Sequence, residues 1–298
     1  MPFLYNIGFG ENKEKKLLLG DSELKSLLYH NIFDYPLTEN ELVKWVAGSR
    51  VDVAVKEEYI TKKKNGLFFL EGKECVVYKR LLKKRISTRK FQIAKKTANL
   101  LSAIPTIKLI AITGSLAMEN ASDDSDIDLL MITKRGTLWT TRLFTLLFLK
   151  LLGVPVRRFK DKKQKDKTCM NIWLDESVLS WPASDRNSYT AHEIAQIKPL
   201  LNRNGTYEKF MADNVWLKDY WPNSVKLNRE SKIKKRIKKS PSISTRSLSG
   251  VIWLFEKFAF KLQYVYMKAK ITREVITPVR AIFHPYDWGE VVLRQLTS

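Results

Sequence analysis

Two apolar runs near the middle of the chain predict neighbouring buried strands. The first, residues 107–112, is rich in β-branched side chains and ends just before Gly114, which permits a tight turn. The second, residues 127–132, follows a turn-forming sequence at residues 122–125. Residues 115–120 lie between the runs and contain helix formers without a helix breaker. The pattern therefore predicts a strand, a turn, a short helix and a second strand.

After the second strand, the sequence contains one long apolar stretch followed by two shorter extended runs. Residues 138–152 form a long apolar stretch that predicts a helix. Residues 154–159 and 168–175 are shorter extended runs on either side of a basic connector, and they predict an antiparallel pair of strands. Together these elements predict an α+β protein with a mixed sheet and flanking helices.

The N-terminal part of the chain predicts short helices followed by a hairpin. Residues 24–33 and 39–46 have helical spacing, and Thr38 can cap the second helix with Glu41 at the capping-box position. Residues 59–70 predict a hairpin because an Asn-Gly pair lies between two extended runs. A winged-helix-like unit is therefore expected here.

A third short helix, expected at residues 51–58, bears on what such a unit would bind. Helix, turn, helix and a basic-tipped hairpin resemble the winged helix, a module often used on DNA. The expected third helix is short and carries Asp52, Glu57 and Glu58, which would face the phosphates of DNA. The alternative is a winged-helix-shaped packing or protein-contact domain that does not bind in a DNA groove.

The C-terminal third of the chain is expected to be helical. Residues 191–199, 207–216 and 251–270 place apolar side chains at intervals of three to four residues between charges. The longest apolar stretches, residues 143–152 and 251–266, are too short or are interrupted by charged residues. We therefore expect no stable membrane insertion.

Composition adds a strong charge to this picture. The chain has 298 residues, of which 44% are hydrophobic, and a formal net charge of +22. A positive field of this kind favours polyanionic partners such as nucleic acid, an acidic membrane or phosphorylated ligands.

Cys75 and Cys169 are the only cysteines, and two cysteines indicate neither a disulfide framework nor a cysteine zinc site. With no signal-peptide pattern at the N-terminus, the expected location is cytoplasmic. His30, His192 and His284 have no metal-ligand spacing.

Basic residues are concentrated in three places, residues 79–90, 157–167 and 226–239. The first group lies on an expected helix that joins the N-terminal unit to the sheet, and the second lies in the connector before the last predicted strand. Basic clusters on either side of a nucleotide pocket would neutralise the phosphates of an acceptor. The affinity of the protein for such an acceptor would then fall as the salt concentration rises. The alternative is a solvated basic surface, which is the interpretation for the third group alone.

The residues best suited to chemistry lie where the second strand begins. Asp126 and Asp128 are two residues apart on an extended run, so both carboxylates share one face. Adjacent carboxylates repel each other unless a cation lies between them, and hard oxygen ligands of this kind suit Mg²⁺ bound to substrate phosphates. Gly114 and Ser115 open a short helix whose first amides would face a phosphate. These residues predict a site for magnesium and a nucleotide.

Gly114-Ser115, ten intervening residues and Asp126-Ile127-Asp128 resemble the signature of the polymerase beta-like nucleotidyltransferase superfamily. The resemblance implies that the glycine and serine hold a triphosphate and that the two aspartates carry Mg²⁺. It also implies a third carboxylate, on a later strand, that activates the acceptor hydroxyl. The expected reaction is transfer of a nucleoside monophosphate from a nucleoside triphosphate to an unidentified acceptor, and the charge favours nucleic acid or another acidic molecule. We divide the chain into a winged-helix-like domain (residues 1–78), a nucleotidyltransferase catalytic domain (79–182) and a helical C-terminal region (183–298).

The third carboxylate is not evident in the sequence. Asn171 is central in the last predicted strand, whereas Asp166 lies in the connector and Asp175 near the strand end. An asparagine can bind a cation through its carbonyl oxygen but takes no proton, so Asn171 would preserve binding without general-base help. The alternative function is a catalytically silent nucleotide- or nucleic-acid-binding regulator on the same fold. Arg142, in the helix after the second strand, is a candidate contact for the triphosphate or a structural ion-pair partner.

Overall fold

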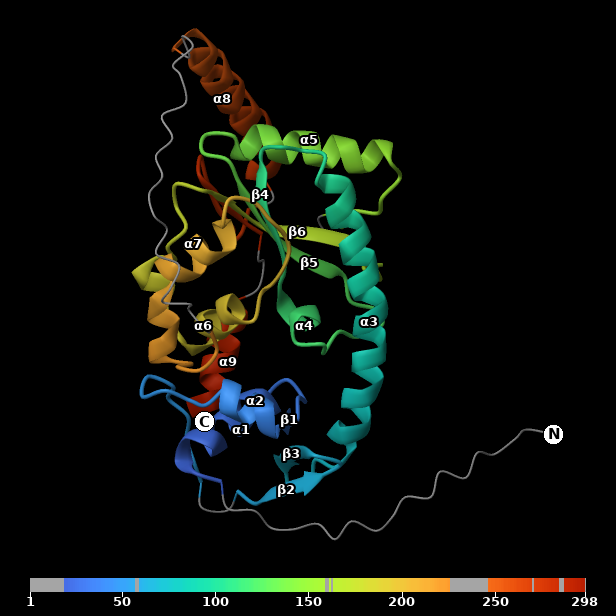
Figure 1. The fold of residues 1–298 in the computed structure, drawn as a ribbon, viewed down its shortest axis with the longest axis vertical. Helices are drawn as coiled ribbons and strands as arrows, with labels where there is room; N and C mark the ends of the chain where they lie inside the picture. Colours follow the sequence, from blue (N-terminus) through green and yellow to red (C-terminus); the bar gives the residue numbers. More distant parts are fainter. Residues whose placement is uncertain are drawn as a thin grey trace, which may run out of the picture.

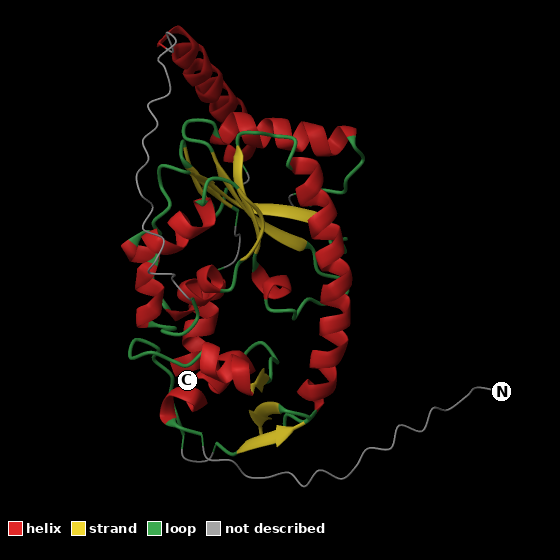
Figure 2. Cartoon of the chain, viewed as in Figure 1, coloured by secondary structure: helices red, strands yellow, loops and turns green. Residues whose placement is uncertain are grey.

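A computed structural model describes most of the chain, namely residues 19–56, 59–158, 161, 163–225, 246–269, 271–283 and 287–297. These residues form a mixed α+β fold around one six-stranded sheet, with a smaller three-stranded sheet at one end of the molecule (Figures 1 and 2). Both parallel and antiparallel neighbours occur in the large sheet, and helices cover both of its faces. The predicted α+β class with a mixed sheet and flanking helices is confirmed.

The N-terminal unit combines two helices with the small sheet, whose strand order is β1-β3-β2. Its elements are α1 (Asp21–Asn31), β1 (Leu37–Thr38), α2 (Glu39–Lys44), β2 (Thr61–Lys64) and β3 (Leu67–Leu70).

The sequence predicted two local features of this unit correctly. Thr38 caps α2, since its Oγ1 accepts from the Glu41 amide at 3.3 Å and Glu41 Oε2 accepts from the Thr38 amide at 2.9 Å. The hairpin turns at Asn65 and Gly66, whose φ angles are 51° and 74°. Both features depend only on residues that are close in the sequence.

The helix expected at residues 51–58 is not present in residues 51–56, while residues 57 and 58 lie outside the described part of the chain. Val51 and Val53 are buried and the residues between and after them are exposed, so burial here has a period of two. The amide of Ala54 donates to the carbonyl of Leu296 at 2.8 Å. Contact with the C-terminal end of the chain therefore overrides the weak helical pattern.

A long helix, α3 (Cys75–Leu101), runs from the small sheet along the large one (Figure 1). It leads into the elements that carry the motif, and these follow the sequence expectation closely. They are β4 (Ile107–Ile112), α4 (Gly114–Ala117), β5 (Ile127–Thr133), α5 (Leu138–Leu151) and β6 (Thr168–Asp175).

The antiparallel pair predicted for residues 154–159 and 168–175 is wrong. Val156 forms only an isolated parallel bridge with Thr168, and residue 159 lies outside the described residues. Instead, β6 pairs in parallel with β5 and antiparallel with β9 (Arg280–Ile282), which comes from the other end of the chain. A partner more than a hundred residues away left no local signal in the sequence.

The sequence analysis expected a helical C-terminal region, and this expectation is wrong in part, because the described part of the region also contains three strands. Strands β7 (Lys198–Asn202), β8 (Val275–Thr277) and β9 join the large sheet, whose order is β7-β4-β5-β6-β9-β8. The helix expected at residues 191–199 ends at Ala195, and Pro199 lies in the edge strand β7, where a missing amide is tolerated. The remaining elements are α6 (Ser188–Ala195), α7 (Thr206–Asp213), α8 (Arg246–Lys268), α9 (Trp288–Thr297) and short 3-10 turns at Ala183–Asp185 and Val215–Asp219.

Two hydrophobic cores lie on opposite faces of the large sheet. On one face, Ile127, Leu129 and Met131 pack with side chains of α3, α5 and α8. On the other, Leu130 and Ile132 belong to a core shared by the N-terminal unit and the helices α6, α7 and α9. The N-terminal unit and the end of the chain therefore meet on the same face of the sheet.

Two histidines that are far apart in the sequence come together in that shared core. His30 and His192 are 1% and 4% exposed, and their Nε2 atoms are 3.1 Å apart. His30 Nδ1 lies 2.8 Å from the Ser26 carbonyl, which can only accept, so Nδ1 carries a hydrogen and His192 Nε2 donates to His30. The pair links α1 to α6.

Two sequence expectations fall outside the described residues, the basic run at residues 226–239 and His284. Of the helices in the described part, none is both long and apolar enough to span a bilayer.

Candidate functional site

The two aspartates of the motif lie side by side at the beginning of β5. Asp126 directly precedes the strand and is 9% exposed, and Asp128 is partly buried. Asp128 alternates with Ile127 and Leu129, so it points to the face of the sheet covered by α6. The expected placement of both carboxylates on one face agrees with this geometry.

An irregularity in β6 brings two further side chains to the aspartates. Asp128 pairs with Cys169 and Leu130 pairs with Ile172, so β6 has one residue more than β5 in this interval. Asn171, which is 6% exposed, donates from Nδ2 to Asp128 Oδ1 at 2.8 Å. Potential ligand atoms of Asp126, Asp128 and Cys169 all lie within 4.8 Å of one another.

Arg157 neutralises part of the negative charge of this cluster. Its Nη1 donates to Asp126 Oδ2 at 2.7 Å and lies 3.9 Å from the sulfur of Cys169. Arg157 comes from the segment that the sequence placed in a strand and that instead runs beside the start of β6. The sequence analysis counted it only as part of a basic cluster.

Burial and the closeness of the two carboxylates raise pKa values in this cluster. Burial and the neighbouring charge of Asp126 raise the pKa of Asp128 to about 7, although Arg157 acts in the opposite direction. Burial and the two carboxylates also raise the pKa of the Cys169 thiol far above its usual value. The thiol is therefore protonated at neutral pH and is a poor metal ligand in this state.

Gly114 forms the turn that lies against Asp128. Its φ is +60°, a conformation that favours glycine, and a Cβ at this position would lie 3.0 Å from Asp128 Oδ2. The backbone just before this turn is also bonded to Asp128, since the amide of Thr113 donates to the carbonyl of Asp128 at 3.1 Å. Ser115 follows the turn and is exposed. The structure thus brings Gly114 to the aspartates, with Ser115 at the adjacent surface.

Glu193 of α6 is a member of the site that the sequence analysis missed. Its carboxylate accepts a hydrogen bond from the backbone of Gly114, and Gln196 donates to it at 2.6 Å. Gln196 also donates to the Gly114 carbonyl at 3.4 Å. Burial raises the pKa of Glu193 to about 7, against the effect of these hydrogen bonds. Long-range contacts place α6 beside the site, namely the shared core and the pairing of the following strand β7 with β4. No pattern near Glu193 in the sequence therefore marked it as a site residue.

Arg142 does not join the site. It lies on α5 beside the opposite face of the sheet, where Nη1 donates to Gln263 Oε1 at 2.5 Å. Its guanidinium is 4.7 Å from the ring centre of Phe283, and burial lowers its pKa to about 10. The assignment of Arg142 as a nucleotide contact is therefore corrected, and its partner is an amide rather than an acidic residue.

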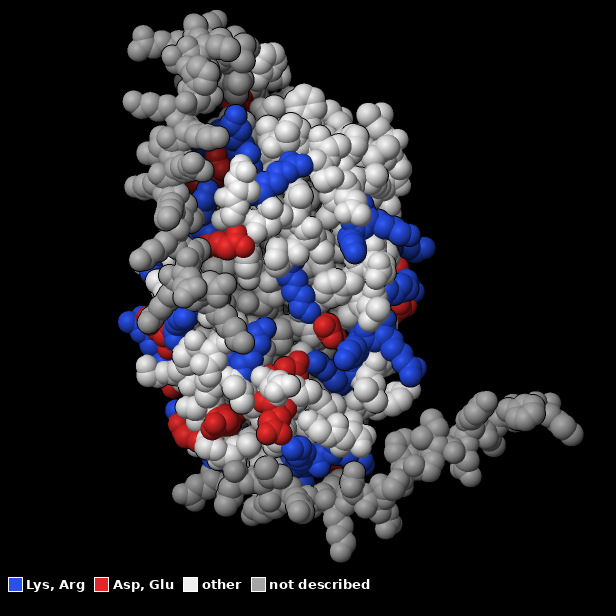
Figure 3. Space-filling view, in the orientation of Figure 1, with Lys and Arg blue, Asp and Glu red and all other residues white. Residues whose placement is uncertain are grey.

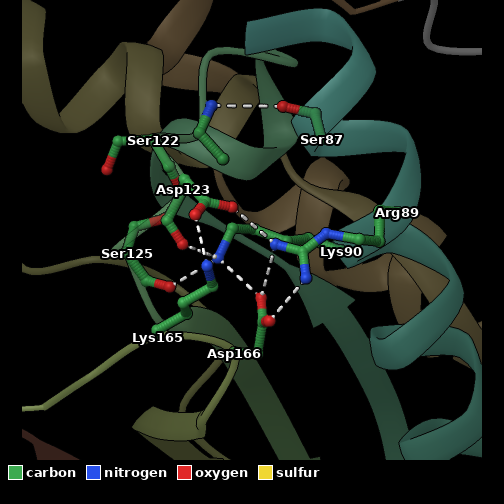
Figure 4. A network of polar contacts seen from close by, with 9 residues as sticks. Ser87, Arg89, Lys90, Ser122, Asp123, Ser125, Lys165 and Asp166 are labelled. Atoms are coloured by element: carbon green, nitrogen blue, oxygen red, sulfur yellow. Dashed lines mark hydrogen bonds and ion pairs between the residues drawn. The ribbon is translucent and has the colours of Figure 1, made fainter.

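A polar network fixes the loop that leads into Asp126 (Figure 4). The buried ammonium of Lys90 donates to the carbonyls of Asp123 and Ser125 at 3.0 and 2.7 Å, and to Asp166 Oδ1 at 2.8 Å. Arg89 binds Asp123 and Asp166 as well, at 2.8 and 2.7 Å. Arg89 and Lys90 belong to the basic group that the sequence analysis expected beside an acceptor. In the structure they hold the loop before Asp126 in place.

Asp166 and Asp175, the two other acidic residues near the predicted third position, have structural partners elsewhere. Asp166 belongs to the network with Lys90, and Asp175 accepts from the Gly136 amide at 2.6 Å and from the Ser177 amide at 2.9 Å. Neither belongs to the group formed by the motif aspartates. Asn171 is therefore the β6 residue that contacts Asp128 in the predicted third position.

Comparison of the chain with protein-family models and with curated proteins finds no match.

Proposed function

We propose that the protein is a magnesium-dependent nucleotidyltransferase that moves a nucleoside monophosphate from a nucleoside triphosphate to an acceptor. The observation that supports this proposal most strongly is the position of Asp128 directly against the Gly114 turn, with Asp126 beside Asp128. A turn without a side chain lets a phosphate approach the backbone and the carboxylates together. This arrangement agrees with the resemblance to the polymerase beta-like nucleotidyltransferase superfamily.

The donor atoms of the cluster fit Mg²⁺. The carboxylates of Asp126 and Asp128 are hard oxygen ligands, and the buried Asn171 Oδ1 makes no hydrogen bond. An unsatisfied buried acceptor is unfavourable unless a cation or another donor binds it. Cys169, held as a thiol, does not contribute to a magnesium site. When bound, the ion would neutralise charge on the phosphates during transfer.

The surrounding residues have distinct roles in this proposal. Asp126, Asp128 and the amide oxygen of Asn171 hold the metal, while Gly114 and Ser115 contact the phosphates. Glu193 keeps the Gly114 turn in position through its hydrogen bond. These contacts orient the reacting groups, which is the main contribution of a protein to phosphoryl-type transfer.

The acceptor proposed from the charge is a nucleic acid or another acidic molecule. The net charge of +22 supports an anionic partner, but two local features limit where it binds. Residues 51–56 form no recognition helix, so we do not assign DNA binding to the N-terminal unit. Lys79, Arg80 and Arg89 of α3 pair with acidic residues of the chain itself.

A second function, a catalytically silent regulator that binds nucleotide, is favoured by one specific observation. Asn171, at the position of the expected third carboxylate, donates to Asp128 and takes no proton. A protein with this residue can retain magnesium and nucleotide while lacking a base for the acceptor hydroxyl.

The two functions differ in whether pyrophosphate is released. The purified protein is incubated with each nucleoside triphosphate, labelled at the α-phosphate, with and without Mg²⁺ and with candidate nucleic-acid acceptors. Nucleotidyl transfer predicts label in the acceptor and magnesium-dependent pyrophosphate, both abolished in Asp126→Ala/Asp128→Ala. A control with the same change of charge is Asp124→Ala/Asp213→Ala, in which both residues are exposed.

Three outcomes distinguish the proposals. Turnover that the motif variant loses and the control keeps supports the enzyme. Magnesium-dependent binding without turnover supports the regulator. Equal nucleotide binding by wild type and the motif variant, without turnover in either, would contradict both.

A further inference from the structure

Helices α5 and α8 expose an unusually large number of big apolar side chains. The exposed fractions of the ten largest contributors lie between 49% and 85%. On the face of the molecule shown in Figure 3, the surface over α5 is mostly without charged side chains, whereas charges are frequent farther down. We call this the α5–α8 surface; it consists of Phe144, Leu147, Leu151, Trp253, Leu254, Phe255, Phe258, Leu262, Val265 and Tyr266.

The exposure of α8 is not the result of a detached helix. Its inner side contains the buried Ala259 and Met267. Glu256 accepts from the amides at the start of α5, at 2.6 Å from Trp139 and 2.9 Å from Thr140. Gln263 donates to the carbonyl of Trp139 at 2.8 Å. The helix is therefore held by its inner side, with an apolar outer side left at the surface.

A hollow opens within the same surface. Its volume is about 620 Å³, and the side chains of Phe144, Phe148 and Phe255 line it. Lys134 also lines it, together with threonines at the start of α5. The hollow therefore combines aromatic and aliphatic side chains and threonines with one basic side chain.

The charge beside the apolar residues has a single sign. Lys257, Lys261 and Lys268 are exposed and recur at intervals of four and seven residues, which places them along one stripe of α8. Glu256 is the single acidic residue in the sequence of this helix, and it is engaged with α5. Pairing of α8 with a second copy of itself would bring lysines together without compensating acids. An anionic partner is the complementary one.

A lipid surface combines the two properties that this face requires. Helices that lie on membranes place Trp, Phe and Leu among the acyl chains and lysine at the headgroups. Anionic headgroups attract such lysines in addition to the hydrophobic effect. We propose that the α5–α8 surface docks on an anionic lipid membrane, with the lysine stripe at the phosphates and the aromatic side chains in the outer acyl layer. This docking uses no residue of the candidate nucleotide site.

Sedimentation with vesicles tests the proposal on the full chain. The protein is mixed with vesicles of phosphatidylcholine alone and with vesicles of equimolar phosphatidylcholine and phosphatidylglycerol. We expect binding to the anionic vesicles, weakening as salt increases, and little binding to the neutral ones. Failure to bind the anionic vesicles at low salt would overturn the proposal.

Substitutions separate docking by this surface from general attraction of a basic protein. Phe255→Ser/Phe258→Ser should reduce binding to background, whereas Val43→Ser/Val215→Ser, at exposed valines elsewhere, should leave it unchanged. Lys257→Gln/Lys261→Gln should lower the partition coefficient roughly 25-fold, because each lysine near such a surface contributes about a five-fold effect. The matched control is Lys95→Gln/Lys96→Gln on α3, at two exposed lysines.

Two results would contradict the assignment. Equal losses in the lysine variants and their control would show attraction by overall charge alone. Concentration-dependent dimers in solution that dissociate on Phe255→Ser/Phe258→Ser, with no vesicle binding, would assign the surface to a second copy of the chain. Thermal unfolding of each variant confirms that it is folded before binding is compared.

Discussion

Arg157 donates from Nη1 to Asp126 Oδ2 at 2.7 Å, so one of the two motif carboxylates already has a cationic partner from the same chain. Asp126 is nearly buried and Arg157 is about one third exposed. A metal ion held as proposed would therefore compete with this guanidinium to neutralise the same carboxylate.

Replacing Arg157 should make the stability of the protein depend on magnesium. Without Mg²⁺, Arg157→Gln leaves two adjacent carboxylates with less compensation, and we expect a loss of about 2 kcal/mol in the free energy of unfolding. Mg²⁺ should restore most of that loss, because it binds the native site and not the unfolded chain. Chemical unfolding with and without Mg²⁺ measures both effects. Arg158→Gln, at the exposed neighbouring arginine, is the control, and equal behaviour of the two variants would argue against the competition.

Asn171→Asp should strengthen metal binding. The change adds a carboxylate beside Asp128 at the place where the amide now donates, and we expect the affinity for Mg²⁺ to rise roughly ten-fold. Asn171→Leu, of similar volume and without oxygen, should weaken it. Calorimetric titration with Mg²⁺ compares the three proteins. Unchanged affinity in both variants would remove Asn171 from the proposed ligand set.

Lys90→Met should destabilise the protein, because Lys90 holds the loop before Asp126 in place. Lys90 is fully buried and donates to Asp166 and to two carbonyl oxygens, so its removal breaks a largely buried ion pair and two hydrogen bonds in this loop. We expect a loss of about 3–5 kcal/mol in the free energy of unfolding, as for a broken buried ion pair. Urea denaturation measures the loss, with Lys96→Met on the same helix as the exposed control. A difference below about 1 kcal/mol between them would show that the network is weak.

The His30–His192 pair should make the protein less stable in mild acid. Burial lowers the pKa of His30 from 6.5 to about 4 and lowers that of His192 well below its usual value. Because the unfolded chain binds more protons than the folded one between these pH values, the contribution is complete above about pH 6.5 and is lost as the pH falls towards 4. For His30 alone, the loss at pH 5 is on the order of 2 kcal/mol.

Denaturation at pH 7.5 and pH 5 tests this effect by comparing wild type with His192→Phe. The aromatic replacement keeps a ring among Tyr29, Trp45 and Trp221 and removes one titrating group. The variant should lose less stability than wild type between the two pH values. An identical loss would place the acid sensitivity in other groups.

Local patterns in the sequence predicted the parts of the fold that depend on near neighbours. Strands β4 and β5 are mainly apolar runs, and their expected positions agree with the structure. The cap at Thr38 and the turn at Asn65 depend on residues within a few positions of each other. The placement of Asp126, Asp128 and Gly114 follows from these elements.

Features that depend on distant pairing could not be predicted in the same way. Glu193 reaches Gly114 from α6, a helix that long-range packing and the pairing of β7 with β4 place beside the site. Arg142 is placed by its contact with Gln263 on a helix more than a hundred residues later. For these two residues the sequence shows the chemical group but not the side of the sheet to which it belongs. Asn171 was expected from the sequence in the third position, but the extra residue in β6 beside Asp128 was not.

The central claim is that Asp126 and Asp128 hold a metal through which a nucleotide binds. The most direct test is the dissociation constant of a non-hydrolysable nucleoside triphosphate, measured with and without Mg²⁺ for wild type and Asp126→Ala/Asp128→Ala. We predict that binding by wild type requires Mg²⁺ and that the variant binds roughly 100-fold more weakly in its presence. The same dissociation constant for both proteins, or binding by wild type that is independent of Mg²⁺, would contradict the account.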